Sequence, residues 1–351
     1  MLHSAANWCE MFESVSHPAG PKWIWLVTCG FIGLVLVFGV LWISRVTRMP
    51  LKSFRGPLPA LTPAQSELAQ RLAGHVKVLS ENIGERNARK PESFHAVKEY
   101  AREELHRGGY EVSEYPYSLD GQKVSNLQAI LAGTESATVI VGAHYDSVAG
   151  TVGADDNATG VAAVLELARM MQGGKTQKTI RFVLFVNEEP PFFQTDAMGS
   201  LVYARQLARD HVTVSSMISL EMLGYYSDSP SSQKYPSGIG LFYPERGDFI
   251  GFVGKSDSPE LLRSAIRRFR ETTSFPSEGI AAPTEWPGIG WSDHWSFWRE
   301  HYPAIMITDT AIFRNPHYHT PNDTADTLDF DRMARVVGGI QQVVQSLASE
   351  P

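Results

Sequence analysis

Hydrophobic and polar residues alternate in two ways along the chain from residue 64 onward. Stretches with an apolar residue every three or four positions predict amphipathic helices, and short, nearly continuous apolar runs predict buried strands. The order of these stretches, strand then helix, predicts an α/β fold with a mostly parallel mixed central sheet flanked by helices. We expect helices over 64–79, 93–107, 159–171, 199–209, 259–272 and 331–347, and strands over 126–132, 137–143, 179–186, 214–222 and 304–308.

The N-terminal part of the chain has a different pattern. Residues 23–43 form an apolar run of 21 residues without a charge, with tryptophans near both ends. Such a run is long enough to cross the hydrocarbon core of a bilayer as a helix, and we expect a transmembrane helix there. A buried core helix and a cleaved signal peptide are the alternatives.

This pattern predicts four segments. Residues 1–22 are an N-terminal tail, 23–43 the membrane helix, 44–63 a linker rich in proline, and 64–351 the folded domain. Prolines stiffen a linker and favour extended backbone. Four basic residues follow the apolar run and one precedes it, which by the positive-inside rule places the domain in the cytoplasm.

Composition and charge exclude several classes of protein. Lys and Arg number 31 against 38 Asp and Glu, a formal net charge of -7, and no basic run occurs, so we expect no nucleic-acid partner. Both cysteines, Cys9 and Cys29, precede residue 30. A disulfide scaffold or a thiolate zinc site is therefore excluded, and any metal site further along must use nitrogen and oxygen ligands.

Polar side chains follow several of the expected strands at the point where each ends. In open α/β sheets these carboxyl ends form the ligand-binding edge. Each such residue by itself is more typical of a turn, a helix cap or a solvated loop. Together they indicate a cation, because converging carboxylates repel one another unless a cation lies between them. Carboxylates and imidazoles without thiolates suit zinc, or else manganese or cobalt. The segments are His144–Asp146, Gly153–Asn157, Glu188–Glu189, Glu221 and Pro316–Thr324.

Five blocks of sequence, in order and spacing, resemble a known family. They are GAHYDSVAGTVGADDNATGVAAVLELAR, FVNEE, SLEMLGYY, SDHWSFW and HYHTPNDTADTLDF. These blocks closely resemble the zinc aminopeptidase family, metallopeptidase family twenty-eight, over about residue 64 to the C-terminus. The resemblance implies the sandwich fold of the zinc exopeptidases and two zinc ions per chain.

The resemblance also implies a metal ligand at each block. One zinc would be bound by a histidine and a glutamate, the second by a glutamate and a histidine, and one aspartate would bridge the two. A cis peptide bond between Asp155 and Asp156 is implied as well. The ligands in that order are His144, Glu221, Glu189, His319 and Asp155.

Three further residues have catalytic roles by the same resemblance. Glu188 would be the general base that activates a metal-bridging hydroxide, and Asp146 would orient His144 from behind. Tyr318 would donate its hydroxyl to the tetrahedral oxyanion, with a packed aromatic ring as the alternative. Glu221 departs from the family pattern, where many members have Asp.

For other residues near these motifs, the sequence leaves two alternative roles open. Arg314 either binds a substrate carboxylate or caps a loop, and Asp293 and His294 either line the cleft or support the fold. Asp323 is expected to stabilise the turn after His319. Residues 225–290 are expected to shape a specificity pocket, lined by Trp286, Trp291 and Phe297.

The function predicted from these features is that of a zinc-dependent exopeptidase, most simply an aminopeptidase acting on peptides. A glutamate-carboxypeptidase-like enzyme, a one-zinc glutaminyl cyclase-like enzyme and a non-catalytic receptor-like module are the alternatives. Members of the family act outside the cytoplasm, which opposes the charge rule and favours a single-pass anchor with a periplasmic or extracellular domain. The oligomeric state stays open.

Overall fold

A computed structural model describes residues 22–119, 121–236 and 238–349. The chain divides into two compact units, and the division falls between Arg45 and Val46. The predicted linker, residues 44–63, therefore lies from Val46 onward in the larger unit. Helix α1 begins at Lys22 and ends at Thr47.

No helix in the described part of the chain combines the length and the hydropathy that crossing a bilayer requires. The transmembrane helix expected over 23–43 is not supported, although this stretch is helical within α1. The predicted tail, residues 1–22, lies outside the described residues except for Lys22.

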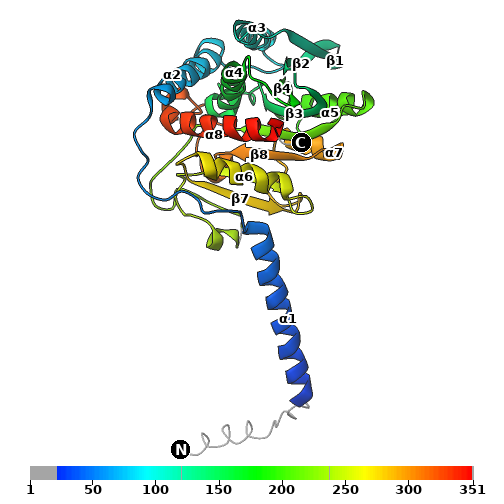
Figure 1. Cartoon of the computed structure of the whole chain (residues 1–351), viewed down its shortest axis with the longest axis vertical. Coiled ribbons are helices and arrows are strands. Elements are labelled where there is room, and N and C mark those ends of the chain that lie inside the picture. The colour runs from blue at the N-terminus through cyan, green and yellow to red at the C-terminus, as the bar shows by residue number, and fades with distance from the viewer. Residues whose placement is uncertain (1–21, 120, 237, 350–351) are drawn as a thin grey trace, which may run out of the picture. The chain divides into compact units, whose positions relative to one another are not determined.

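An eight-stranded sheet forms the centre of the larger unit (Figure 1). Its spatial order is β1-β2-β4-β3-β5-β8-β6-β7. Strands β4, β3, β5 and β8 are neighbours and run parallel, while β1, β2 and the β6–β7 pair join them by antiparallel pairing. The bounds are β1 Val112–Leu119, β2 Gln122–Leu131, β3 Glu135–His144, β4 Lys178–Phe185, β5 Val214–Glu221, β6 Ile250–Lys255, β7 Ser277–Ala282 and β8 Ala304–Thr308.

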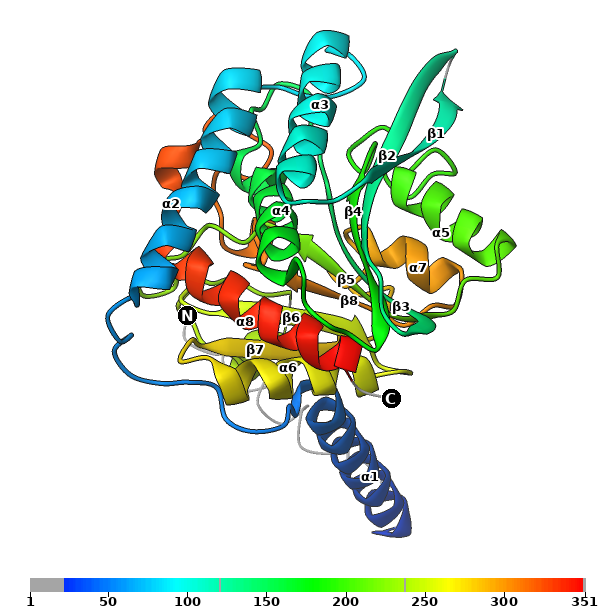
Figure 2. The same ribbon diagram turned by 45° about the horizontal axis from the view of Figure 1, so that its top comes forward.

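Helices cover both faces of this sheet (Figure 2). One face carries α3, α4, α8 and α6, with α2 packed on α4 and α8, and the other carries α5 and α7. Apolar side chains fill the space between each layer and the sheet. The bounds are α2 Pro63–Lys77, α3 Pro91–Arg107, α4 Gly160–Met171, α5 Gly199–Arg209, α6 Glu260–Thr272, α7 His294–Arg299 and α8 Phe330–Ser349.

The predicted mixed α/β fold is confirmed, and each expected helix and strand is present within a few residues. Strands β1, β6 and β7 and helix α7 were missed. The sequence of β1 contains Pro116, which suits its place at the sheet edge but weakens the strand pattern. Strands β6 and β7 contain glycine and alanine in place of the large β-branched residues that mark a strand.

Candidate metal centre

The predicted site residues converge because four parallel strands end side by side. His144 is the last residue of β3 and Glu221 the last of β5, two strands that are paired in the sheet. Glu188 and Glu189 lie in the loop after β4, which ends at Phe185 and is the neighbour of β3 on its other side. The loop after β8 supplies His319. Parallel pairing thus brings residues far apart in sequence to one edge of the sheet.

The first half of the site surrounds the Nε2 atom of His144. This nitrogen lies 3.3 Å from Asp156 Oδ1, 3.4 Å from Glu221 Oε2 and 3.8 Å from Glu188 Oε2. All four side chains are buried. His144, Asp156 and Glu221 each offer a ligand atom close enough together for one metal ion.

The second half lies around His319, which is half-buried. Its Nε2 atom is 3.2 Å from both Asp156 Oδ2 and Glu189 Oε2. These three residues form another group with ligand spacing. Asp156 presents one carboxylate oxygen to each half, which is the position that a bridging ligand requires.

The structure corrects the residue expected to bridge the halves. Asp155 was expected there, but its carboxylate points away and accepts hydrogen bonds from Gly224 N at 2.9 Å and Asn315 Nδ2 at 2.7 Å. Asp156 is the aspartate in both ligand groups. The cis peptide bond is likewise one residue later than expected, between Asp156 and Asn157.

A second layer of hydrogen bonds holds the ligands in place. The Asp146 carboxylate lies 3.6 Å from His144 Nδ1 and accepts hydrogen bonds at 3.1 Å from the backbone N–H groups of Glu188 and Glu189. Asp146 thus positions His144, as expected, and also the Glu188–Glu189 pair on the next strand. Such outer contacts orient metal ligands.

Asp323 has a different role from the one expected. Its carboxylate reaches across to the loop before α4 and accepts hydrogen bonds from Asp155 N at 2.8 Å and Asp156 N at 3.1 Å. The C-terminal motif therefore supports the backbone of Asp156, the aspartate common to both halves, as well as supplying His319.

Three other supporting residues were not identified from the sequence. Asn157 donates to Leu220 O at 2.9 Å and accepts from Gly160 N, so it caps α4. Ser292 donates to Glu221 Oε2 at 2.7 Å. The motif SDHW contained this serine, but only the tertiary structure places it beside Glu221.

The third is Arg86, which is fully buried behind the site. Its guanidinium donates to the backbone carbonyls of Tyr145, Val152 and Gly153. Burial lowers the pKa of Arg86 to about 10, against the raising effect of nearby carboxylates including Asp323 and Asp146. No motif marks this arginine in the sequence.

Crowding of carboxylates perturbs the acid–base properties of the site. Burial, together with the charges of Glu221 and Glu189, raises the pKa of Glu188 well above its usual value despite His144. Burial and the charge of Asp156 raise the pKa of Glu189 to about 7. Although burial opposes it, hydrogen bonds to Asp156 and Glu189 raise the pKa of His319 to about 10. Closely packed groups of this kind are typical of functional sites.

The donor atoms of the site fit a metal. Among the described residues, His144 Nε2 and Glu189 Oε1 are buried polar atoms without a hydrogen-bond partner. Buried polar atoms are normally satisfied, and those that are not need a ligand or another explanation. The donors are imidazole nitrogens and carboxylate oxygens, a set that zinc accepts.

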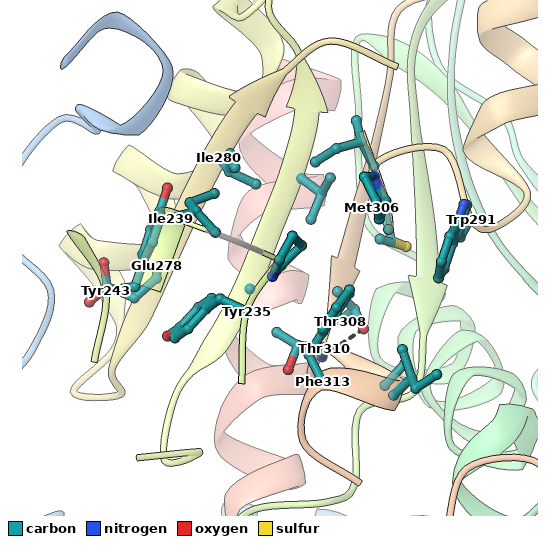
Figure 3. A pocket seen from close by; sticks show the side chains of 18 of the residues that line it. Tyr235, Ile239, Tyr243, Glu278, Ile280, Trp291, Met306, Thr308, Thr310 and Phe313 are labelled. Carbon is teal, nitrogen blue, oxygen red and sulfur yellow. Dashed lines mark hydrogen bonds between the residues drawn. The ribbon is translucent and has the colours of Figure 1, made fainter. Parts of the chain in front are cut away.

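A largely apolar cavity of about 130 Å³ adjoins this cluster over strands β6, β7 and β8 (Figure 3). Glu221 and Tyr318 belong to its lining, which connects it to the metal-ligand groups. Trp286 and Trp291 line it as expected. Phe297 does not, because it is buried in the core between the sheet and helices α5 and α7.

The remaining candidates divide between site and scaffold. The ring of Tyr318 stacks on that of His319, with the centroids 3.8 Å apart. Arg314 is buried and donates to Gln233 Oε1 at 2.8 Å and to Tyr225 O at 3.4 Å, which places it in loop support. His294 is buried and its Nε2 contacts Ile289 O at 2.7 Å.

Comparison with known proteins identifies the family to which these residues belong. The model of "Peptidase family M28" matches residues 126–344. The chain belongs to this family. Its identification as a family member and as a hydrolase of the peptidase class is therefore confirmed.

Individual relatives span the chain to different extents. It is 37% identical over 303 residues to the uncharacterized protein YfbL of Escherichia coli K12, covering 83% of this chain and 93% of the relative. It is 28% identical over 222 residues to a probable leucine aminopeptidase of Trichophyton verrucosum, covering 59% of this chain and 53% of the relative. The chain thus spans about half the length of that aminopeptidase.

A solved structure with a similar fold is BSAP, a zinc aminopeptidase from Bacillus subtilis. It superimposes with a TM-score of 0.65 at 14% sequence identity, and the match covers 81% of this chain and 95% of that one. This likeness concerns the fold.

Proposed function

We propose that this protein is a zinc-dependent aminopeptidase that removes residues with large apolar side chains from the N-terminus of peptides. The observation that carries the proposal is one cluster of six metal-competent side chains, five of them buried, beside an apolar cavity. Membership of the M28 peptidase family and a fold shared with a described zinc aminopeptidase support it. We propose both the two zinc ions per chain and the peptide substrates with a large apolar N-terminal residue.

Five side chains would hold two zinc ions, and a sixth, Glu188, would act as the base beside them. His144, Asp156 and Glu221 would hold one and Asp156, Glu189 and His319 the other. Bound zinc would supply Lewis acidity and lower the pKa of water to about 7. Glu188 also lies in a ligand-spaced group with His144 and Glu189. The two groups above would hold both ions without it, which would leave its oxygens available to act as a base.

Glu188 would move the proton. Its carboxylate is buried, with Oε2 3.8 Å from His144 Nε2, and burial raises its pKa, which is the direction that strengthens a base. We propose that Glu188 takes a proton from the attacking water and delivers it to the leaving amine. Asp146 keeps the carboxylate in place through the backbone of Glu188.

Tyr318 would stabilise the charge that develops on the substrate oxygen. Burial raises the pKa of its hydroxyl well above the usual value, so the group keeps its proton and stays a donor. Its ring lines the cavity and is held against His319. A donor in this position is suited to an oxyanion.

The cavity favours an aminopeptidase over a carboxypeptidase. A carboxypeptidase needs a cation in its cavity for the substrate carboxylate, and Arg314, the candidate for that role, does not belong to the cavity lining. Its Nε and Nη1 atoms donate to Gln233 and Tyr225, and its Nη2 atom is buried outside that lining without a hydrogen-bond partner in the described chain. Among the described residues of the cavity lining, Lys234 is the one basic group, and it is exposed.

A panel of substrates with measured zinc content tests this proposal. Zinc-loaded protein should carry two zinc ions per chain and hydrolyse leucyl and phenylalanyl anilides, but not their N-acetyl forms. Glu188→Gln should keep the zinc and lose about 10³-fold in kcat. One zinc per chain with cyclisation of N-terminal glutamine would favour a glutaminyl cyclase, and unchanged turnover of Glu188→Gln would remove the base assignment.

A further inference from the structure

The N-terminal segment Met49–Ser53, part of the predicted linker, packs against the outer wall of the cavity. That wall is β7, whose residues Glu278, Gly279 and Ile280 belong to the lining. Strand β7 is the last in the sheet, and β6 is its one strand partner in the described chain. Its other edge faces the segment Met49–Ser53.

Ser53 forms the direct contact with the edge of this strand. Its hydroxyl accepts a hydrogen bond from Ser277 N at 2.9 Å and is also bonded to the Glu278 carboxylate. An edge strand leaves backbone N–H groups unpaired, and here a side chain of the linker satisfies one of them. Figure 3 labels Glu278, which Ser53 contacts, among the residues that line the cavity.

Arg270 of α6 fastens the segment to the strand. Its Nη1 atom donates at 3.0 Å to both Pro50 O and Leu51 O, while its Nε atom donates to Ser277 Oγ at 3.0 Å. Its Nη2 atom lies 3.7 Å from Glu278 Oε2. One guanidinium therefore bonds the linker backbone and β7 together.

Met49 lies directly behind the wall. A Cβ atom added at Gly279 would come within 2.8 Å of Met49 Cγ and 3.0 Å of Ile266 Cδ1, so no side chain fits there. On the cavity side, the Tyr243 hydroxyl donates to Gly279 O at 2.8 Å, and Tyr243 itself lines the cavity. Gly279 is thus held between the linker and a residue of the cavity.

We propose that Met49 and Ser53 are specificity-determining residues, because they hold the β7 wall of the substrate cavity at the distance that admits a large apolar side chain. The proposal rests on the proposed function for its substrate, since it assigns this cavity to the first residue of the peptide. Neither residue belongs to the metal-ligand groups, so they act on selectivity through the position of β7.

Full-length, zinc-loaded Met49→Ala and Ser53→Ala variants test this directly. Each should lower the phenylalanyl-to-alanyl ratio of kcat/KM by about fivefold or more, mainly through KM for the phenylalanyl substrate. Gly279→Ala should lower the ratio further, and Met49→Ala in the same chain should restore part of it by making room for the new methyl group. The zinc content of each variant should equal that of the parent chain.

Arg335→Ala is the matched control. Arg335 Nη2 donates to Pro59 O, so this variant releases a later part of the predicted linker at α8, away from the cavity. Its substrate ratio should match the parent. A ratio that stays within twofold in Met49→Ala and Ser53→Ala, or that falls equally in Arg335→Ala, would overturn the proposal.

Binding separates this inference from the proposed function. Trp286 and Trp291 in the lining report binding of L-phenylalaninamide and L-alaninamide by fluorescence. If the parent chain binds the larger amide more tightly but hydrolyses no substrate, the proposed function fails, and a loss of that preference in the variants still supports the inference. A parent chain that binds both amides equally contradicts the inference whether or not it is active.

Discussion

Two adjacent aspartates in the GADDN motif have opposite environments. Burial, and then the charge of Asp309, raises the pKa of Asp155 well above its usual value, and burial likewise raises that of Asp309 to about 6. Two carboxyl groups this close share a proton. Asp156 has the opposite shift: burial opposes it, but His144 and His319, whose Nε2 atoms lie 3.3 Å and 3.2 Å from its carboxylate, outweigh burial and lower its pKa. Asp155 thus supports the loop, and Asp156 has the charge that a shared metal ligand requires.

Substituting each aspartate in turn should separate these roles. Asp156→Asn removes the carboxylate shared by both ligand groups, so zinc content should fall to less than half of the parent value, and activity should be lost. Asp155→Asn replaces a proton-sharing carboxyl by a neutral amide of similar shape and should keep most of the zinc. Metal analysis of the dialysed proteins checks this. The reverse order of zinc loss would restore Asp155 as the bridge.

Arg86 provides a second test at this scale. Its guanidinium is fully buried and bonded to the carbonyls of the loop that leads to Asp156. Arg86→Gln leaves several of these carbonyls without a donor, so we expect a loss of about 3 kcal/mol in the free energy of unfolding. Urea denaturation of the zinc-free chain measures it. A loss below about 0.5 kcal/mol, as is usual at surface positions, would contradict the assigned role.

At the scale of elements, one glutamate joins α2 to α4. Glu166 on α4 is buried, and its carboxylate lies 2.9 Å from Arg71 Nη2, 3.1 Å from His75 Nε2 and 2.8 Å from Arg169 Nε. Arg71 and His75 belong to α2. Since α4 begins directly after the ligand loop, this contact fixes the outer helix to the element that supports Asp156.

The pH dependence of stability should show this contact. Burial opposes ionisation, but hydrogen bonds from His75, Arg71 and Arg169 lower the pKa of Glu166 from 4.5 to about 2. A lowered pKa in the folded state stabilises the protein above pH 4.5, and this contribution is lost as the pH falls towards 2. Glu166→Gln should therefore cost about 2 kcal/mol at pH 7 and progressively less below pH 4.5.

Urea unfolding of the parent and variant between pH 3 and 7 measures the difference. Glu103→Gln is the control, because Glu103 is 66% exposed and lies 3.4 Å from Arg107 on the same helix surface. Exposed pairs of this kind contribute about 0.5 kcal/mol or less. A difference between Glu166→Gln and the parent that stays constant with pH would rule out the charged contact.

At the scale of the whole molecule, the metal centre joins segments from four strands. A ligand that binds the folded chain alone stabilises it by about 2.7 kcal/mol at 100 times its dissociation constant. Chelation should therefore lower the midpoint of thermal unfolding by about 5 °C or more, and added zinc should restore it. Calorimetry on the parent and on Asp156→Asn checks this. Equal shifts in both proteins would place the stabilising zinc elsewhere.

Much of the site could be predicted because its ligands follow strands that the hydrophobic pattern marks. His144, Glu189, Glu221 and His319 lie in the ligand groups, as expected. The prediction that Asp155 rather than Asp156 faces both histidines was wrong, because two adjacent carboxylates are equivalent in a sequence motif. Only the backbone conformation decides which of the two side chains points into the site. Arg86 could not be found, since its partners are backbone carbonyls that carry no residue identity.

The amino-acid sequence by itself determined the order of strands and helices, the donor chemistry and the family, because these depend on local periodicity and on residue types at short spacings. The tertiary structure alone decided which aspartate faces both histidines, how Asp323 supports it, and that Met49–Ser53 packs behind the cavity wall. Those features depend on contacts between segments distant in sequence, and only the pairing and packing of the sheet bring such segments together.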